Sequence, residues 1–345
     1  MIAPTMYSNS LSWIVTLTLL LTASAGCGGA KDATDTKSDA HDHSSPAVAH
    51  TYQGEYPIKA LSTIGQVAEM VRRVGGEHVE VTQLMGPGID PHLFKPVAED
   101  TRALRNAEAI FYSGLHLEGR MTDLFEQMAR RKLTYAVTSG LSTRKDPRLR
   151  KPPEFEGVYD PHVWHDVSLW SQCVEDIAEE LAIYDPSHAE EYKKNAKTYR
   201  NELSELDAWV KSEVEKLPTD QRVLVTAHDA FEYFGAAYGF EVFGLKGISS
   251  ELEKDLHHQE VIQAMIIKRN VPAVFVESAI APRTVRALVE PCRAAGHDLQ
   301  VPDATLYADV LGKPSTDAET YAGMIRHNVT TIITALFREP ALSEK

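Results

Sequence analysis

The stretch Asp160-Pro161-His162-Val163-Trp164-His165-Asp166 repeats a motif that first occurs seventy residues earlier, as Asp90-Pro91-His92. A third histidine, His228, follows the apolar run 223–225 in Thr226-Ala227-His228-Asp229-Ala230-Phe231. Each of these histidines lies where a strand-like run gives way to the start of a helix. In open α/β sheets, side chains at the carboxyl ends of strands project into the crevice where ligands bind. The three motifs therefore predict an α/β fold in which the histidines share one site.

In the first half of the chain, segments with the periodicity of a strand alternate with segments that have the periodicity of a helix. Strand patterns occur at 57–63, 79–84, 109–113 and 134–138, and helical patterns at 66–74, 97–106 and 121–130. Strands that alternate with helices imply a parallel sheet covered on both faces. Residues 140–158, which contain three prolines, are expected to form a loop that leads to the second Asp-Pro-His motif.

The longest helical pattern of the chain runs over 187–217. Its apolar residues step by three and four positions without Gly or Pro, at Tyr192, Ala196, Tyr199, Leu203, Leu206, Val210, Val214 and Leu217. A shorter helix is expected at 167–181. Strand patterns then return at 222–226, 241–245, 273–277 and 299–301, with helical patterns at 230–238, 258–268, 282–295 and 320–336. The fold predicted is α/β, with two four-stranded parallel-sheet lobes joined by one long helix and a metal ion in the cleft between them.

The expected domain organisation follows from these patterns. We expect a signal peptide at 1–27, a disordered tether at 28–55, an N-terminal α/β lobe at 56–185, a linking helix at 186–218 and a C-terminal α/β lobe at 219–345. A chain of 345 residues has the length for two such lobes. Because one helix resists bending more than several loop crossovers do, we expect modest closure of the lobes.

Residues 1–27 have the pattern of an export signal. An apolar stretch at 11–25 ends in Ser24-Ala25-Gly26-Cys27, which is similar to a bacterial lipobox. Ser24 stands where Leu is usual, and residues 1–10 contain no Lys or Arg. We expect a lipid anchor on Cys27 and a location in the periplasm or at the cell surface; signal cleavage without lipid and an uncleaved anchor are the alternatives.

Residues 28–55 contain almost no large apolar side chain, which is typical of a disordered tether. The tether contains His41, His43 and His50. These histidines either collect metal ions transiently or are incidental parts of a solvated linker.

Composition excludes some classes of protein. The formal net charge is −14 and no cluster of Lys and Arg is present, which argues against nucleic-acid binding. After residue 25 no run of eighteen apolar residues occurs. Cys173 and Cys292 fall on helices of different predicted lobes, so we expect both to be free and buried.

Four side chains are the candidate metal ligands: His92, His162, His228 and Asp309, the last in Tyr307-Ala308-Asp309-Val310-Leu311-Gly312. Imidazole and carboxylate together suit Zn²⁺, Mn²⁺ and Fe²⁺ better than Ca²⁺ or Mg²⁺. Three histidines and one carboxylate make a closed four-ligand set for Zn²⁺. A carboxylate that binds through both oxygens would raise the coordination number and suit Mn²⁺, so the residue types alone do not choose the metal.

Other residues compete for a place in the site. His165 lies one helical turn from His162 and is expected near the site or at the surface, and Asp303 competes with Asp309 as the carboxylate. The remaining candidates have structural interpretations: His116 and Glu118 would pack or cap, Glu277 would be a buried hydrogen-bonded carboxylate, and His257, His258 and His327 would be surface residues.

The sequence resembles the metal-binding solute receptors of zinc and manganese ABC importers. The resemblance runs from about residue 56 to 336 and is carried by Gly86-Pro87-Gly88-Ile89-Asp90-Pro91-His92, Gly114-Leu115-His116-Leu117-Glu118-Gly119, Asp160-Pro161-His162-Val163-Trp164, Thr226-Ala227-His228-Asp229-Ala230-Phe231, Thr320-Tyr321-Ala322-Gly323-Met324 and Arg326-His327-Asn328. The resemblance places the ligands of that family on His92, His162, His228 and Asp309, in agreement with the motif pattern.

The function that the resemblance implies is an extracytoplasmic receptor that captures Zn²⁺ or Mn²⁺ and delivers it to an ABC transporter permease. We expect this receptor to be a monomer. Manganese receptors of this kind often have Glu at the third ligand position. Here that position is His228, which favours Zn²⁺, with Mn²⁺ as the alternative. The chain lacks the long His/Asp/Glu-rich loop of the zinc-specialised branch.

Two other functions remain open at this point. A zinc-dependent hydrolase would need an open coordination position beside a general base, and the chain contains neither a His-Glu-x-x-His nor a Gly-x-Ser-x-Gly motif. A role as a metal-binding surface adhesin is compatible with the same sequence. We therefore predict a transport receptor and not an enzyme.

Overall fold

The computed structural model describes residues 51–155 and 157–338, which belong to one compact unit. The predicted signal peptide with Cys27, and the tether histidines His41, His43 and His50, lie outside these residues. Residues 51–55, at the end of the predicted tether, contact the folded chain, because the Tyr52 N–H donates to the Tyr184 carbonyl at 2.6 Å. The predicted domain boundaries stay predictions.

The first sheet has four parallel strands in the order β2-β1-β3-β4. Its strands are β1 (Ile58–Ser62), β2 (Val79–Gln83), β3 (Ala109–Tyr112) and β4 (Leu133–Ala136). The helices α1 (Gly65–Gly75), α2 (Ala98–Asn106) and α3 (Thr122–Ala129) lie between them in the chain. The central strands β1 and β3 are mostly buried, as a parallel sheet covered by helices requires, whereas the edge strands β2 and β4 are only partly buried. The alternation predicted for this half is confirmed.

The segment expected as a loop at 140–158 contains two short helical turns, α4 (Ser139–Thr143) and a 3-10 turn at Pro153–Phe155. It leads to the second Asp-Pro-His motif and then to α5 (Val167–Tyr184). Asp166 caps this helix, since its Oδ1 accepts the Leu169 N–H at 2.9 Å. The capped start of this long helix lies four residues after His162 and therefore anchors the loop that carries His162.

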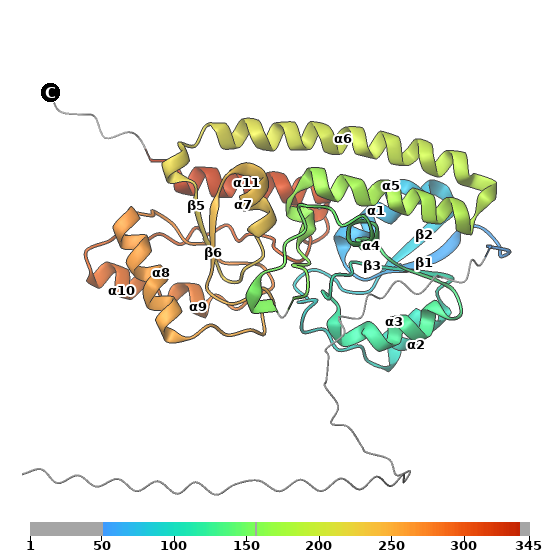
Figure 1. Ribbon diagram of the computed structural model, residues 1–345, viewed down its shortest axis with the longest axis horizontal. Coiled ribbons are helices and arrows are strands. Elements are labelled where there is room, and N and C mark those ends of the chain that lie inside the picture. The colour runs from blue at the N-terminus through green and yellow to red at the C-terminus, as the bar shows by residue number, and fades with distance from the viewer. Residues whose placement is uncertain (1–50, 156, 339–345) are drawn as a thin grey trace, which may run out of the picture. The chain divides into compact units, whose positions relative to one another are not determined.

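The long helix α6 (Ala189–Glu215) has the apolar face that its periodicity predicts. Every apolar residue of the predicted stripe within it is buried, from Tyr192 to Val214. Its 27 residues span about 40 Å. The helix packs against α1 and α5 beside the first sheet, and against α7 (Glu232–Tyr238) beside the second (Figure 1).

A second helix also links the two halves. The closing helix α11 (Tyr321–Leu336) packs against α6 and reaches α1. At its start, the Tyr321 N–H donates to the Glu69 carboxylate at 2.6 Å and the Tyr321 hydroxyl donates to the Trp164 carbonyl at 2.6 Å. The sequence predicted only one connecting helix. The helical periodicity of residues 320–336 predicts a helix there, but it does not show that this helix contacts α1.

The second sheet is less regular than predicted. Only β5 (Val223–Thr226) and β6 (Glu241–Gly244) form a continuous parallel pair among the described residues. The segment 273–277 lies beside β5, with the Phe275 N–H donating to the Val225 carbonyl at 2.9 Å, and makes isolated parallel bridges to Gln300 and Leu306. All four predicted strand positions are thus adjacent, but two of them are not regular strands.

Pro302 explains the interruption. The Gln300 N–H donates to the Pro272 carbonyl and the Val274 N–H donates to the Gln300 carbonyl, so the next donor in this parallel register would be the N–H of residue 302. Proline has no N–H, and the ladder stops. Pairing resumes at Leu306, whose N–H donates to the Val276 carbonyl at 2.8 Å.

The helix predicted at 282–295 is divided into α9 (Arg283–Arg286) and α10 (Val289–Ala294). Pro291 is the cause, because a proline removes one helical hydrogen bond and its ring clashes with the carbonyl four residues earlier, which is that of Ala287. The preceding helix α8 (Leu256–Arg269) is continuous and is capped by Asp255, whose Oδ1 accepts the His258 N–H.

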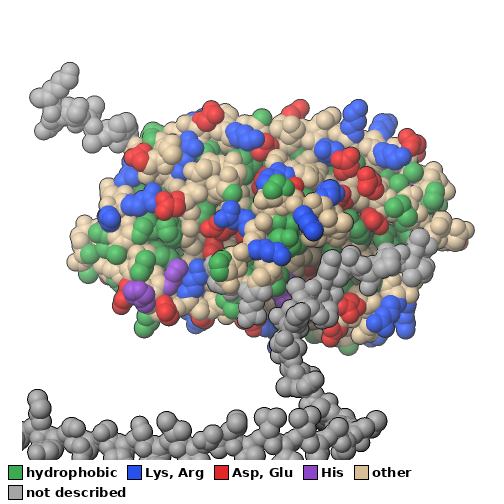
Figure 2. Space-filling view, in the orientation of Figure 1, with side chains coloured by type: hydrophobic (Ala, Val, Ile, Leu, Met, Phe, Trp, Pro, Cys, Tyr) green, Lys and Arg blue, Asp and Glu red, His purple; other side chains and the backbone are tan. Residues whose placement is uncertain are grey.

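The surface carries charges of both signs. On the face drawn in Figure 2, basic and acidic side chains are intermixed, so this face of the described residues presents no continuous basic track. Within the described ranges no helix is both long enough and apolar enough to cross a bilayer. Cys173 and Cys292 are free and buried, as predicted.

Candidate metal centre

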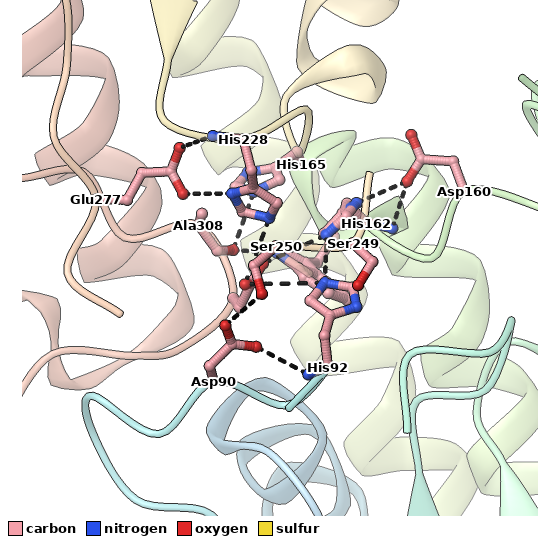
Figure 3. Close-up of polar contacts among 12 residues, drawn as sticks. Asp90, His92, Asp160, His162, His165, His228, Ser249, Ser250, Glu277 and Ala308 are labelled. Carbon is pink, nitrogen blue, oxygen red and sulfur yellow. Dashed lines mark hydrogen bonds and ion pairs between the residues drawn. The ribbon is translucent and has the colours of Figure 1, made fainter. Parts of the chain in front are cut away.

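The three predicted histidines and Asp309 come together at the ends of sheet strands and in the loops that follow them. His228 lies two residues after β5 ends at Thr226, and Asp309 follows the segment that bridges to 273–277. His92 and His162 come from the two Asp-Pro-His loops. One nitrogen or oxygen atom of each residue lies within 4.8 Å of those of the other three (Figure 3 shows the histidines).

The distances within this group centre on the Asp309 carboxylate. Its Oδ1 lies 3.4 Å from His162 Nε2, and its Oδ2 lies 3.5 Å from His228 Nε2 and 4.0 Å from His92 Nε2. His92 Nε2 and His162 Nε2 are 3.2 Å apart. Five polar atoms of four side chains from distant parts of the chain therefore face one small volume.

The polar atoms of these four residues are buried, so leaving them without hydrogen-bond or metal partners would destabilise the folded chain. His162 and His228 are fully buried, Asp309 is 1% exposed and His92 is 7% exposed. His228 Nε2 and both carboxylate oxygens of Asp309 have no hydrogen-bond partner among the described residues. A buried polar atom left without a partner costs about 1–3 kcal/mol. A cation at the centre of the group would satisfy all of these atoms together.

Two further carboxylates orient the imidazoles. Asp160 Oδ1 lies 2.8 Å from His162 Nδ1, and Glu277 Oε2 lies 2.5 Å from His228 Nδ1. A carboxylate at Nδ1 holds a proton on that nitrogen, so the lone pair is left on Nε2, which faces the centre. Metal-binding histidines in proteins are commonly held in this way.

The Asp-Pro-His motif has a local structural reason. In both copies the aspartate Oδ1 accepts the backbone N–H of the histidine two residues later, at 2.9 Å from His92 N and from His162 N. This is an Asx turn, in which Asp fixes the chain direction and Pro restricts φ between the two residues. The motif therefore aims a histidine by a short-range interaction that the sequence itself specifies.

The buried charges shift the pKa values of the group strongly. Burial lowers the pKa of His162, but the charges of Asp160 and Asp309 outweigh it and raise the pKa to about 9. Burial alone would also lower the pKa of His228, yet Glu277 and Asp309 raise it well above its usual value. Burial raises the pKa of Asp309, whereas the neighbouring histidines lower it well below its usual value. Burial lowers the pKa of His92 to about 3.

These shifts predict a pH dependence for the metal-free protein. Because His162 has a pKa of about 9 in the folded chain and 6.5 as an unperturbed group, its contribution to stability is fully present below pH 6.5 and is lost as the pH rises to 9. His92 has a lowered pKa and acts only below pH 6.5. The melting temperature of chelator-treated protein should therefore fall between pH 6.5 and 9.

The control for this prediction is His162→Gln, which cannot titrate and should reduce the fall, leaving the part that comes from His228, whose pKa is also raised. Metal-induced stabilisation should change in the opposite direction over the same range, since a metal ion must displace the imidazole proton. A melting temperature of the metal-free protein that rises from pH 6.5 to 9 would contradict the pKa direction for His162.

The other predicted candidates lie outside the group. His165 is buried, its ring stacks on Phe231 at 4.3 Å between centroids, and its Nε2 lies 3.1 Å from the Ala308 carbonyl. Burial lowers its pKa to about 3, which makes it a neutral donor to that carbonyl. Asp303 is exposed. The structure thus brings Asp309, and not Asp303, to the three histidines.

The residues expected to pack or cap have such contacts. Glu118 is buried and accepts hydrogen bonds from the Thr63 hydroxyl at 2.6 Å and the Ser113 N–H at 2.8 Å. His116 is exposed, and a Cβ at Gly119 would lie 2.7 Å from its Nε2. His257 is exposed, and the half-buried histidines on α8 and α11 contact carbonyl oxygens: His258 Nε2 lies 2.9 Å from Gly244 O, and His327 Nε2 lies 2.9 Å from Thr305 O.

The sequence did not predict that Asp160 would contact the His162 ring or that Glu277 would contact the His228 ring. It predicted a buried, hydrogen-bonded Glu277 but not its contact with His228, which lies 49 positions away. The signal for Asp160 was present, since an aspartate two residues before a histidine is the Asx-turn spacing. No local signal could have identified the Glu277 contact, because it depends on segment 273–277 lying beside β5.

A second group with metal-ligand chemistry is formed by Glu77, His78 and Glu191. His78 Nε2 lies 2.7 Å from Glu191 Oε2, and the His188 ring stacks on His78 at 3.7 Å between centroids. Glu77 and Glu191 are exposed. The direct pairing of His78 with Glu191 accounts for the closeness of these residues without an ion.

Comparison with known proteins gives consistent similarities. Residues 61–335 match the family model described as "Zinc-uptake complex component A periplasmic". The chain is 40% identical to the manganese-binding lipoprotein MntA of Bacillus subtilis over 280 residues, covering 81% of this chain and 90% of the relative. It is also 40% identical to the zinc-binding protein TroA of Treponema pallidum over 278 residues, covering 81% and 88%. The solved structure of the periplasmic zinc-binding protein TroA from Treponema pallidum superposes with a TM-score of 0.77 at 39% identity, covering 83% of this chain and all of that one.

Proposed function

This chain belongs to the family of periplasmic zinc-uptake component A proteins, and from that membership we infer that it is an extracytoplasmic receptor that captures Zn²⁺ or Mn²⁺ for an ABC importer. Two of its relatives are named for these two ions, manganese in one and zinc in the other. The partner that follows from this function is the membrane permease of the importer. The fold of the solved relative, at 39% identity, supports the same inference.

We propose that His92, His162, His228 and Asp309 bind the ion. The observation that carries this proposal is the buried carboxylate of Asp309, whose two oxygens have no hydrogen-bond partner among the described residues while three imidazole nitrogens surround them at 3.4 to 4.0 Å. A buried anion needs positive charge nearby; the raised pKa values of His162 and His228 indicate that protons supply it in the metal-free chain, and a metal ion would replace those protons. Four protein ligands leave no obligatory position for a catalytic water, which favours capture of the ion over hydrolysis.

Zinc is the proposed cargo, and manganese is the alternative. All three imidazoles have borderline character and follow the Irving–Williams order, in which Zn²⁺ binds more tightly than Mn²⁺. A bidentate Asp309 would allow the higher coordination number that Mn²⁺ prefers. The two oxygens of Asp309 both face the centre, so the same carboxylate can serve either ion.

We also propose that the receptor acts as a monomer held to the membrane by a lipid on Cys27. Two lobes that both supply ligands within one chain need no second copy to complete the site. The proposal of a lipid anchor rests on the lipobox-like Ser24-Ala25-Gly26-Cys27, together with relatives that are named lipoproteins.

Elemental analysis of the protein purified from its own cell envelope tests the function and the choice of metal. We expect about one metal ion per chain, with zinc as the main element, because one four-ligand group is proposed. Native mass spectrometry of the same sample gives the stoichiometry independently. A protein that contains no transition metal and takes up neither Zn²⁺ nor Mn²⁺ after chelation would exclude the receptor function; manganese in place of zinc would overturn only the choice of metal.

A further inference from the structure

The proposed ligands are enclosed, so an ion needs a route to reach them. A cavity of about 490 Å³ touches His92 and, of the four ligands, His92 alone; its wall also includes His116, Ser249, Glu251 and Leu252. His162 and His228 are fully buried on the inner side. His92 therefore lies between the cavity and the other ligands.

His92 is also the histidine with the weakest ring support. The rings of His162 and His228 are each held at Nδ1 by a carboxylate, from Asp160 and Glu277. The corresponding Asp90 bonds only the backbone of His92 through Oδ1. Its other oxygen, Oδ2, accepts a hydrogen bond of 2.5 Å from the Ser250 hydroxyl. The two Asp-Pro-His motifs are thus used differently, one to orient a ring and one to reach a loop 160 positions away.

The loop that carries Ser250 is a compact turn attached to the second sheet. It begins after β6, where Lys246 forms an antiparallel bridge with Glu253 and the Gly247 N–H donates to the Leu252 carbonyl at 2.8 Å. The Lys246 ammonium donates to the Ser250 carbonyl at 2.9 Å. These bonds make residues 246–253 a compact turn, and its base is held to the loop that carries His228, since the Lys246 N–H donates to the Ala227 carbonyl at 3.1 Å and the Asp229 N–H donates to the Gly247 carbonyl at 3.2 Å.

Two side-chain contacts join this turn to the first half of the chain beside the cavity. One is the Ser250–Asp90 hydrogen bond, in which Ser250 is 4% exposed. The other is the ion pair between Arg120 and Glu251, whose side chains are 28% and 54% exposed. Figure 3 shows Ser249 and Ser250 next to His92 and Asp90. None of these contacting atoms belongs to the proposed ligand set.

We propose that the Ser250–Asp90 hydrogen bond is a latch that closes the entrance beside His92 and limits the rate at which the metal ion enters and leaves. This inference rests on the proposed function. The bond joins a buried hydroxyl to a half-buried carboxylate, and charge-assisted bonds of this kind are stronger than neutral ones. The Arg120–Glu251 pair assists it only weakly, since exposed ion pairs contribute little.

A latch of this kind changes rates more than affinity. Its atoms do not bind the ion, so the bond is the same barrier for an ion going in and for an ion coming out. Removing it should therefore raise the association and dissociation rates by similar factors. A residue that supported the ligands themselves would instead raise the dissociation rate and weaken affinity in proportion.

The test is Ser250→Ala in the full-length chain, with Zn²⁺ as the probe. Stopped-flow mixing of zinc-loaded protein with excess fluorescent chelator gives the dissociation rate, and mixing of metal-free protein with Zn²⁺ gives the association rate. We expect both to rise about tenfold, the effect of losing roughly one charge-assisted hydrogen bond, with Kd changed by less than about threefold. Glu251→Gln should raise both rates less than about threefold.

Ser249→Ala is the matched control. Its hydroxyl accepts the Glu251 N–H at 3.3 Å within the same turn and does not reach Asp90, so its rates should stay within about twofold of the native protein. Native-like rates for Ser250→Ala would overturn the latch, as would a dissociation rate that rises alone while Kd weakens equally. If the native chain itself binds no Zn²⁺, the proposed function fails; if the native chain binds and only Ser250→Ala is unaltered, the latch alone fails.

Discussion

His92→Ala and Asp309→Ala should each lose most of the rise in melting temperature that saturating Zn²⁺ gives the native chain. An ion that binds only the folded state stabilises it by RT ln(1 + [L]/Kd), which is roughly 4 kcal/mol at a thousandfold excess over Kd. For a chain of this size that corresponds to a rise of about 10 °C. Removing one of four ligands from a closed set should reduce the rise to a small fraction of this value.

The metal-induced difference, and not the absolute melting temperature, is the quantity to compare. His162→Ala and His228→Ala should also lose the rise, but they leave Asp160 or Glu277 buried without its ring partner, which destabilises the metal-free protein as well. His92→Ala avoids this complication, because Asp90 bonds the backbone at position 92 and the Ser250 hydroxyl.

Asp303→Ala is the matched carboxylate control. Asp303 is exposed and lies six positions before Asp309, so its removal should keep the full metal-induced rise. The assignment of Asp309 would be wrong if Asp309→Ala kept the rise while Asp303→Ala lost it. Differential scanning fluorimetry of each variant with and without Zn²⁺ measures both outcomes.

The parts of the fold that sequence could predict are those fixed by local periodicity. The apolar stripe of α6 repeats without Gly or Pro, so its helix and its buried face followed directly from spacing. The strands of the first sheet were equally clear, because each is a short apolar run bounded by turn residues. Contacts between distant elements were not available in this way, and α11 reaching α1 is one example.

The errors in the second half have identifiable causes in single residues. Pro302 removes the N–H that would continue the ladder beside 273–277, and Pro291 divides the helix predicted at 282–295. Both prolines were visible in the sequence. What sequence did not show was the register, which decides whether a given N–H is needed by a neighbouring strand.

In the site, too, local sequence motifs could be predicted and contacts between distant residues could not. His92 and His162 could be singled out because Asp-Pro-His creates an Asx turn from three adjacent residues. His228 and Asp309 were candidates from their own sequence motifs, and the resemblance to metal receptors agreed with all four residues. The carboxylate behind His228 could not be predicted, because Glu277 and His228 meet only through the pairing of their strands. Ser250 likewise meets Asp90 only in the folded chain.

Changing Glu277 together with the ligand His228 should alter the metal preference more than changing His228 alone. His228→Glu replaces a neutral nitrogen donor with a charged oxygen donor that can bind through two atoms, which favours Mn²⁺ relative to Zn²⁺. The new carboxylate would, however, lie beside Glu277, whose Oε2 is 2.5 Å from His228 Nδ1 in the native chain. Two adjacent buried carboxylates repel, so this variant alone should bind both ions weakly.

Glu277→Gln in the same chain should relieve that repulsion. The glutamine amide can donate to the new carboxylate, and its oxygen can still accept the backbone N–H of residue 228, which Glu277 Oε1 accepts at 2.9 Å in the native protein. We expect the double variant to recover binding and to lower the preference for Zn²⁺ over Mn²⁺ by at least about tenfold relative to the native chain. Competition between the two ions, followed with a fluorescent chelator, measures the ratio of Kd values.

Glu277→Gln without the ligand change is the control that separates orientation from donor type. It presents an amide donor to His228 Nδ1–H, which disfavours the tautomer with a free Nε2 lone pair, so both ions should bind about 10–100-fold more weakly. The donor atoms around the ion are unchanged in this variant, and the Zn²⁺/Mn²⁺ ratio should therefore stay close to native. A double variant whose ratio equals that of the native chain would show that the donor at position 228 does not set the metal preference, and the choice of ion would then have to come from Asp309 and the remaining two histidines.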